Sequence, residues 1–81
     1  MRVTVRLFAR LRDIAGVNEV HTELPAGATA SALWATLVTE HTEFERYGGA
    51  VSTAVNEEYV KMDRVLADGD EVAFLPPVSG G

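Results

Sequence analysis

Hydrophobic and polar residues alternate over residues 2–8 and again over residues 20–24. The apolar positions of these two segments are Val3, Val5, Leu7, Val20 and Leu24. A period of two is typical of a strand with one buried face, so two strands are predicted. Between them the apolar spacing is helical, and Gly16 can end a short helix. Because about two turns of helix are too short for a parallel crossover, we expect the two strands to be antiparallel.

A longer helical pattern follows the break at residues 25–27. Thr29 is suited to cap its N-terminus, because a threonine hydroxyl accepts a hydrogen bond from a free backbone N–H of the first turn. The apolar stripe consists of Ala30, Leu33, Trp34, Leu37 and Val38. We expect this helix to run to about Glu43 and a loop to follow at Gly48 and Gly49.

Three short strands complete the pattern, over residues 51–55, 59–60 and 71–75. The turns between them are predicted at residues 56–58 and 68–70, which are rich in Asn, Asp, Glu and Gly. These segments are too short and too strongly bounded by turn residues to be helices, so they complete a sheet.

This order of elements predicts an α+β fold of the ubiquitin-like β-grasp type, a mixed sheet of about five strands packed on one main helix plus a short helix. We expect a single domain over residues 1–75 and an extended, flexible tail over residues 76–81 that ends in Gly-Gly. The predicted core consists of Val3, Val5, Leu7, Leu24, Leu33, Leu37, Val72 and Phe74. Trp34 is assigned to packing at the flank of the main helix and to no function.

The composition of the 81 residues excludes several kinds of site. There is no cysteine, so a disulfide, a Cys-ligated zinc site and chemistry on a Cys side chain are all excluded. His21 and His41 lie too far apart in the sequence to form a local ligand pair, and no metal site is expected. The net charge of −5 disfavours binding to nucleic acid. Since no apolar run approaches ~20 residues, no membrane segment is predicted. The start MRVTVRLFA alternates instead of forming an uninterrupted apolar run, so no signal peptide is predicted and we expect a cytoplasmic protein.

The C-terminal sequence PPVSGG is the first feature that suggests chemistry. Pro76 and Pro77 end the last strand, because a proline cannot donate a ladder hydrogen bond, and they favour an extended exit from the sheet. Gly80 and Gly81 lack Cβ atoms, so the tip can enter a narrow channel and its carboxylate is open to adenylation and to attack by sulfur. Fully extended, the tail spans roughly 20 Å. The alternative interpretation is a frayed terminus.

A group of apolar residues on the outer face of the sheet is the second such feature. If Val5 and Phe74 point inward, alternation sends Phe8 and Leu75 outward near the start of the tail. Tyr59 is a candidate third member of this group. Clustered apolar side chains in an exposed position indicate a surface that binds a partner.

Two segments carry a resemblance to a known family. The C-terminal AVNEEYVKMDRVLADGDEVAFLPPVSGG and the N-terminal LFARLRDIAG resemble the MoaD family, the small sulfur-carrier subunits of molybdopterin synthase. This family belongs to the MoaD/ThiS/ubiquitin-like β-grasp superfamily. The resemblance covers essentially the whole chain, and the ending DGDEVAFLPPVSGG is its most specific part.

The resemblance implies a function for the C-terminal carboxylate of Gly81. In this scheme an ATP-dependent activating enzyme adenylates the carboxylate, and a sulfur donor protein converts it to a thiocarboxylate. The sulfur then passes to cyclic pyranopterin monophosphate, which forms the dithiolene of molybdopterin. The chain by itself is expected to be no enzyme and to bind no cofactor, since the activating enzyme uses the ATP and the sulfur is covalent on Gly81.

The resemblance also implies the partners and their contacts. The main partner is the large subunit of molybdopterin synthase, in a heterotetramer, and neither nucleic acid nor membrane is expected to bind. The residues expected to contact partners are Phe8, Arg12, Tyr59 and Leu75. The residues expected to insert into the large subunit are Pro76, Pro77, Val78, Ser79 and Gly80, followed by the reacting Gly81.

Three other functions fit the same sequence. A sulfur carrier of the ThiS type, for thiazole synthesis, shares the expected fold and the Gly-Gly ending. A ubiquitin-like protein modifier uses the same activated carboxylate to acylate lysines of target proteins. The third alternative is a small interaction domain whose tail carries no chemistry.

Overall fold

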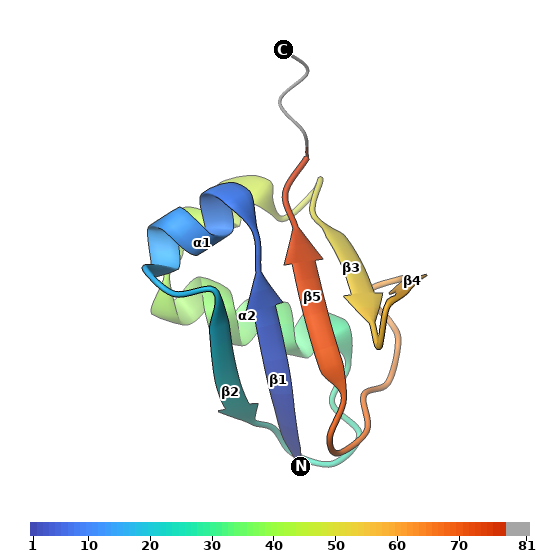
Figure 1. The fold of residues 1–81 in the computed structure, drawn as a ribbon. Coiled ribbons are helices and arrows are strands. Elements are labelled where there is room, and N and C mark those ends of the chain that lie inside the picture. The colour runs from blue at the N-terminus through green and yellow to red at the C-terminus, as the bar shows by residue number, and fades with distance from the viewer. Residues whose placement is uncertain (78–81) are drawn as a thin grey trace.

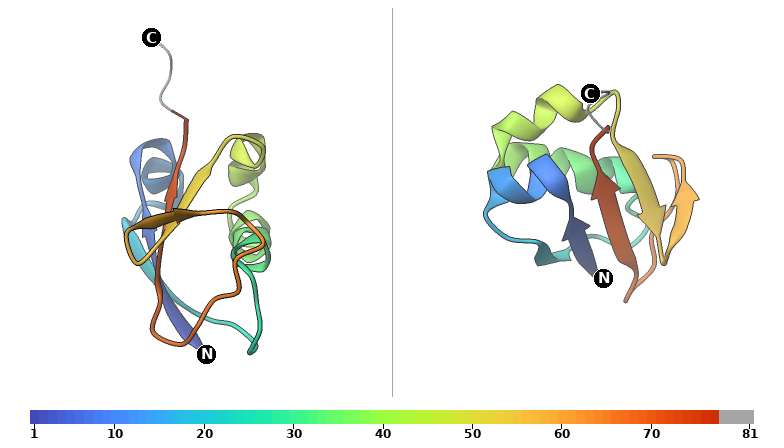
Figure 2. Two further views of the ribbon diagram at one scale, coloured as in Figure 1. Left: turned by 90° about the vertical axis from the view of Figure 1, so that its right-hand side faces the viewer. Right: turned by 45° about the horizontal axis from the view of Figure 1, so that its top comes forward.

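The chain forms a five-stranded sheet with its main helix on one face, as seen in a computed structural model that describes residues 1–77 (Figure 1). In chain order the elements are β1 (Arg2–Leu7), α1 (Ala9–Ala15), β2 (Glu19–Glu23), α2 (Ala30–Glu40), the 3-10 helix η1 (Thr42–Tyr47), β3 (Ser52–Val55), β4 (Glu58–Val60) and β5 (Glu71–Leu75). Helix α2 lies across one face of the sheet, while α1 and η1 lie at the end where β5 leaves it (Figure 2).

The strand order is β2-β1-β5-β3-β4, so the first and last strands of the chain lie side by side in the middle of the sheet. Strand β1 is parallel to β5, and every other neighbouring pair is antiparallel, including β1 with β2 as predicted. The predicted α+β fold with a mixed five-stranded sheet is therefore confirmed.

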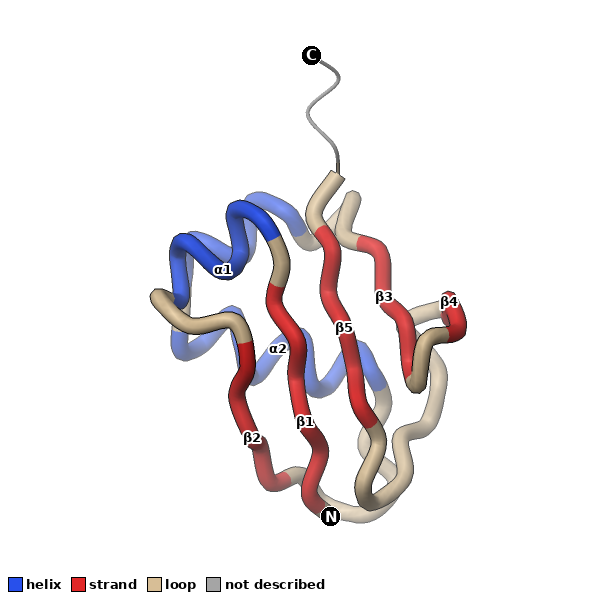
Figure 3. The backbone as a smooth tube through the Cα atoms, viewed as in Figure 1, coloured by secondary structure: helices blue, strands red, loops and turns tan. Residues whose placement is uncertain are grey.

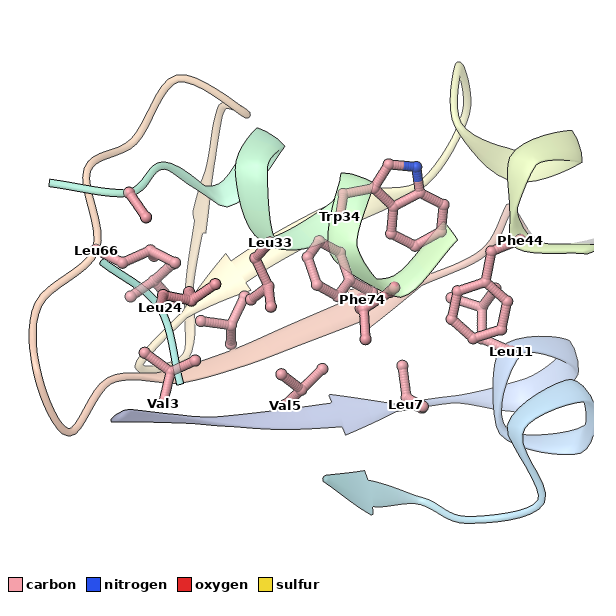
Figure 4. Packing of buried hydrophobic residues seen from close by; sticks show 14 residues of the cluster. Val3, Val5, Leu7, Leu11, Leu24, Leu33, Trp34, Phe44, Leu66 and Phe74 are labelled. Carbon is pink, nitrogen blue, oxygen red and sulfur yellow. The ribbon is translucent and has the colours of Figure 1, made fainter. Parts of the chain in front are cut away.

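The core lies between the sheet and α2, and Figure 4 shows the residues Val3, Val5 and Leu7 pointing into it from β1. All eight core residues predicted from the sequence are buried. The sequence interpretation missed five further members of the cluster, namely Leu11, Ala28, Phe44, Val55 and Leu66. Trp34 is 8% exposed, and its ring centroid lies 5.5 Å from that of Phe44 and 5.1 Å from that of Phe74. Its assignment to packing is confirmed.

Helix α2 begins as predicted but ends earlier. The Thr29 hydroxyl accepts a hydrogen bond from the amide of Ala32 at 3.2 Å and caps the N-terminus. The predicted extension to about Glu43 is wrong, because the α-helix ends at Glu40 and η1 follows. An 11-residue helix is about 16 Å long, close to the length of the strands beneath it. A straight extension would project beyond the core, whereas η1 turns the chain so that Phe44 packs inward.

The strands of the β3–β4 hairpin differ from the prediction by one residue each. β3 begins at Ser52, because the amide of Val51 donates to the carbonyl of Tyr47 at 2.9 Å and not to the sheet. β4 begins at Glu58, because Asn56 and Glu57 alone make the turn, with φ of 50° and 72°. Two consecutive positive φ values are the signature of a tight two-residue hairpin turn. β4 is the short strand at one edge of the sheet, and β2 lies at the other edge (Figure 3).

A network of side-chain hydrogen bonds sets the start of β5. Asp70 accepts from the side-chain amide of Asn56 at 2.9 Å and from the backbone N–H of Ala67 at 2.8 Å. The side-chain oxygen of Asn56 in turn accepts from the backbone N–H of Glu71, the first residue of β5, at 3.0 Å. These bonds fix the position at which β5 enters the sheet, and therefore the position at which it leaves.

We predict that Phe74→Ala destabilises the fold strongly. The side chain points from β5 into the core, is fully buried and packs against Trp34 of α2, so its removal leaves a cavity. Such truncations cost about 3–5 kcal/mol, a large part of the stability of a small domain. Chemical denaturation measures this directly, and a midpoint close to that of the wild type would contradict the packing described above.

Candidate functional site

The tail begins where β5 ends, at the end of the sheet opposite the N-terminus (Figure 1). Pro76, which is partly buried, and Pro77, which is exposed, lie outside any strand, as expected for residues that cannot donate to the sheet. The remaining tail residues of the sequence prediction, Val78, Ser79, Gly80 and Gly81, lie outside the described residues. Their predicted roles, and the predicted flexibility of the tail, stay predictions.

Phe8 and Leu75 lie next to each other where the tail begins. Leu7 pairs with Phe74 in the parallel β1–β5 ladder. Phe8 follows Leu7 and Leu75 follows Phe74, so the same register places Phe8 opposite Leu75. Leu7 and Phe74 point into the core, and alternation sets their successors on the opposite face. Phe8 is 36% exposed and Leu75 is partly buried. The predicted orientation of both residues is confirmed.

A sharp turn between β1 and α1 holds Phe8 in this position. Phe8 is still extended, with φ of −125° and ψ of 154°, but Ala9 has a positive φ of 50°. A left-handed conformation costs an alanine roughly 1–2 kcal/mol. One helical turn later, the amide of Arg12 donates to the carbonyl of Phe8 at 3.4 Å, and the Arg12 side chain is exposed. The backbone of Arg12 therefore lies one helical turn from that of Phe8.

Tyr59 lies on the same face, two strands away from β5. It pairs with Ala54 of β3, and Ala54 pairs with Ala73 of β5, so these three side chains form one row across the outer face. Tyr59 is 75% exposed. The two alanines connect Tyr59 to Leu75, and sequence reasoning did not name them. The alternation within STAV and EVAFL was a signal that could have identified both.

The other half of the outer face, on β1 and β2, is polar. Arg6 lies between two carboxylates, with its guanidinium 3.9 Å from Glu19 and 3.8 Å from Glu71. The hydroxyl of Thr4 and Nδ1 of His21 are 3.3 Å apart. Exposed pairs of this kind contribute little to stability. The apolar residues of the outer face are therefore Phe8, Ala54, Tyr59, Ala73 and Leu75, which we call the outer apolar surface. Phe8 and Tyr59 supply its exposed area, whereas Ala54 is only 8% exposed and Ala73 and Leu75 are partly buried.

The described part of the chain presents an apolar surface on the outer face of β3, β4 and β5. Within residues 1–77, no three His, Cys, Asp or Glu side chains are gathered so that they could hold a metal ion. In the same residues, no helix is long and apolar enough to cross a membrane. The outer apolar surface thus extends along the outer face to the end of β5, where the tail begins.

Comparison of the sequence with known families gives a match over residues 5–81 with the ThiS family. The chain belongs to the ThiS family. Among curated relatives, the molybdopterin synthase sulfur carrier subunit of Chlamydomonas reinhardtii is 41% identical over 83 residues, and the match covers 100% of both chains. The predicted resemblance to sulfur carrier subunits of molybdopterin synthase is confirmed.

Solved structures of this ThiS-family fold agree with the predicted β-grasp. A Pyrococcus furiosus protein provisionally named subunit 1 of the molybdopterin converting factor is 40% identical, with a TM-score of 0.86 over 96% of this chain and 99% of that one. The small archaeal modifier protein 1 of Haloferax volcanii is 31% identical, with a TM-score of 0.87 over 100% of both chains. These two similar structures carry different names, one of a subunit of a molybdopterin converting factor and one of a modifier protein.

We predict that Phe8→Ala and Tyr59→Ala leave the ThiS-family fold stable. Both side chains lie on the outer face, so their removal leaves no cavity in the core. Each change is expected to cost about 1 kcal/mol or less. Thermal melting beside Phe74→Ala, the matched removal of a buried phenylalanine, measures the difference. If Phe8→Ala melts as early as Phe74→Ala, the orientation of Phe8 described above is wrong.

Proposed function

We propose that this chain is the sulfur carrier subunit of a molybdopterin synthase and that the C-terminal carboxylate of Gly81 carries the sulfur. The observation that carries the proposal is the full-length match to sulfur carrier subunits in a chain that itself ends in Gly-Gly. The geometry of the described residues supports it, because β5 leads into that ending from beside an exposed apolar surface.

The proposed chemistry needs an activated main-chain carboxylate. A carboxylate is a poor electrophile, and adenylation gives its carbon a leaving group. A sulfur nucleophile then attacks that carbon, the bond to the adenylate oxygen breaks, and a thiocarboxylate remains on Gly81. The absence of cysteine in the chain is compatible with this route, since the sulfur is bound at the chain terminus. In this proposal a separate activating enzyme uses the ATP, a sulfur donor protein supplies the sulfur, and this chain binds no cofactor.

The outer apolar surface is the proposed contact with the large synthase subunit. Tyr59 and Phe8 supply exposed aromatic area on either side of two small alanines, and aromatic residues are frequent anchors of protein interfaces. Arg12, one helical turn from Phe8, adds a cation at its border. With the surface seated on the partner, Pro76 and Pro77 direct residues 78–81 toward the active site of that partner. A heterotetramer of two small and two large subunits is the proposed assembly, and the catalysis belongs to the large subunit.

We expect that removing Gly81, or adding one residue after it, abolishes sulfur transfer without changing the fold. Either change displaces the reacting carbon by about 3.3–3.6 Å. An error of even ~1 Å can reduce a rate on the order of a hundredfold. The test is turnover of the reconstituted synthase, with thermal melting as the control for folding. Wild-type turnover by either variant would contradict the proposal that the carboxylate of Gly81 carries the sulfur.

We expect that Phe8→Ala and Tyr59→Ala weaken binding to the large subunit while the fold persists. A residue that anchors an interface typically contributes about 2 kcal/mol or more, which corresponds to about thirtyfold in Kd. The measurement is a calorimetric titration of each variant into the large subunit. A matched control is Val65→Ala, because Val65 is 58% exposed but lies outside the outer apolar surface. Equal losses for all three variants would argue against a defined contact surface.

A second function, conjugation of the chain to other proteins through Gly81, is supported by the similarity to the small archaeal modifier protein 1 of Haloferax volcanii. Both functions, and the thiazole-type carrier, begin with the same activated carboxylate. Intact-mass measurement of protein from its own cells separates them. Replacement of one oxygen by sulfur supports a carrier, adducts with other proteins support a modifier, and neither product supports an interaction domain without tail chemistry.

A further inference from the structure

One polar side chain lies within the core. Among residues 1–77, Thr53 of β3 is the only buried polar or charged residue, with 3% of its surface exposed. It pairs with Phe74 of β5 and with Val60 of β4, both of which pack on the core side of the sheet. A valine fits such a strand position equally well and brings no hydroxyl that must be satisfied in apolar surroundings. The hydroxyl of Thr53 is therefore not required for packing.

The hydroxyl of Thr53 has a sulfur atom as its partner. It donates to the thioether of Met62, with Oγ1 and Sδ 3.6 Å apart, and within residues 1–77 this is its one hydrogen bond. A thioether sulfur is a weak acceptor, so the bond returns little of the free energy that burial of a hydroxyl costs. The same hydroxyl would bind a stronger acceptor at this place more tightly.

The backbone of Met62 is fixed to the main helix. Its carbonyl accepts from the amide of Ser31, in the first turn of α2, at 2.8 Å. Two residues further on, the carbonyl of Arg64 accepts from the amide of Ala30 at 2.9 Å. The Met62 side chain is partly buried and packs against the core, whereas both of its neighbours in the sequence are exposed. Met62 thus lies between a buried hydroxyl and the protein surface, where a small oxidant can approach it.

Methionine is the side chain of this sequence that a peroxide attacks most readily. The chain contains two methionines, Met1 and Met62, and no cysteine. Oxidation of the thioether gives a sulfoxide, and methionine sulfoxide reductases convert it back. A sulfoxide oxygen is polar and disrupts an apolar core unless a donor binds it. At Met62 such a donor is already present, 3.6 Å from the sulfur.

We propose that Met62 is a reversible oxidation site, at which a peroxide converts the thioether to a sulfoxide and the hydroxyl of Thr53 then donates to the new oxygen. A lone pair of Sδ attacks one oxygen of hydrogen peroxide, and the O–O bond breaks. The attacked oxygen gives its proton to the departing hydroxide, which leaves as water. The sulfur is oxidised by two electrons and the peroxide is reduced by two. The flexible methionine side chain lets the sulfoxide turn its oxygen toward Thr53.

The pairing with Thr53 allows the fold to keep both states of Met62. In the reduced state the hydroxyl makes a weak hydrogen bond to sulfur, and in the oxidised state it makes a stronger one to oxygen. This exchange offsets part of the free energy that an unpaired oxygen would cost at the contact between the β3–β4 hairpin and α2. Thr53 does not react itself, and its part is to accommodate the product.

The test compares thermal melting of the full chain before and after treatment with hydrogen peroxide, while peptide masses measure the oxygen added at Met62. We expect Met62 to gain one oxygen and the melting temperature of the wild type to fall by less than about 4 °C. In Thr53→Val the same oxidation should lower the melting temperature by about 4–8 °C more, because the sulfoxide loses its donor. Thr53→Ala and Thr53→Ser form a second pair that differs only in the hydroxyl, and it should repeat this difference. A methionine sulfoxide reductase should restore the melting temperature of the wild type.

Met62→Leu is the matched control, because it leaves Met1 as the only thioether of the chain. Its change on treatment measures the contribution of Met1, which is subtracted from that of the other variants. Equal losses within each pair, with and without the hydroxyl, would overturn the role of Thr53. A Met62 that gains no oxygen while Met1 does would overturn the site itself. Each readout is a mass or a melting temperature of the isolated chain, so the result does not depend on the proposed sulfur carrier function.

Discussion

The parallel pairing of β1 with β5 is the interaction on which the rest of the structure depends. It places the first and last strands of the chain in the centre of the sheet, where Val5 and Val72 are fully buried. The same register sets Phe8 beside Leu75, so one ladder determines both the core on the inner face and part of the outer apolar surface. A shift by one residue would exchange these faces and would bury the outward-facing residues in place of the core. The hydrogen bonds of Asp70 and Asn56 oppose such a shift, because they fix the first residue of β5.

Much of this arrangement follows from periodicity in the sequence. The period-two pattern identified β1, β2 and β5 and the faces of Phe8 and Leu75, because burial of one face is a local property of the strand. The length of α2 could not be predicted in this way. Its pattern continues through Phe44, and what ends the helix is the length of the sheet beneath it, which is a tertiary property. The sequence interpretation did not assign Ala54 and Ala73 to the outer apolar surface for a similar reason. A small side chain contributes little to a hydrophobic pattern, and only the pairing of β3 with β5 shows that the two alanines are neighbours.

The proposed reactive group lies at the end of the chain and not in the core, which explains why the described fold loses little stability to function. Many reaction sites need buried charges or unpaired polar groups, which reduce stability. Within residues 1–77, no buried side-chain nitrogen or oxygen lacks a hydrogen-bond partner. The proposed chemistry takes place on a main-chain carboxylate six residues beyond Leu75, so the core needs to supply only a firm base for the tail. Stability and reactivity are thereby assigned to different parts of the chain, and neither limits the other.

One local departure from favourable geometry remains, and its position is informative. Among the described residues, only three non-glycine residues have a positive φ, and for Asn56 and Glu57 the tight hairpin turn accounts for it. Ala9 has no such turn. Strained residues persist where the surrounding structure determines them, and they often occur near functional surfaces. Here the strain reverses the chain directly after Phe8, so that α1 can cover the end of the core with Leu11 while Phe8 still faces outward beside Leu75. If Ala9 had a negative φ, the chain could not both bury Leu11 in the core and keep Phe8 on the outer face. The position of Phe8 in the outer apolar surface therefore depends on the positive φ of Ala9.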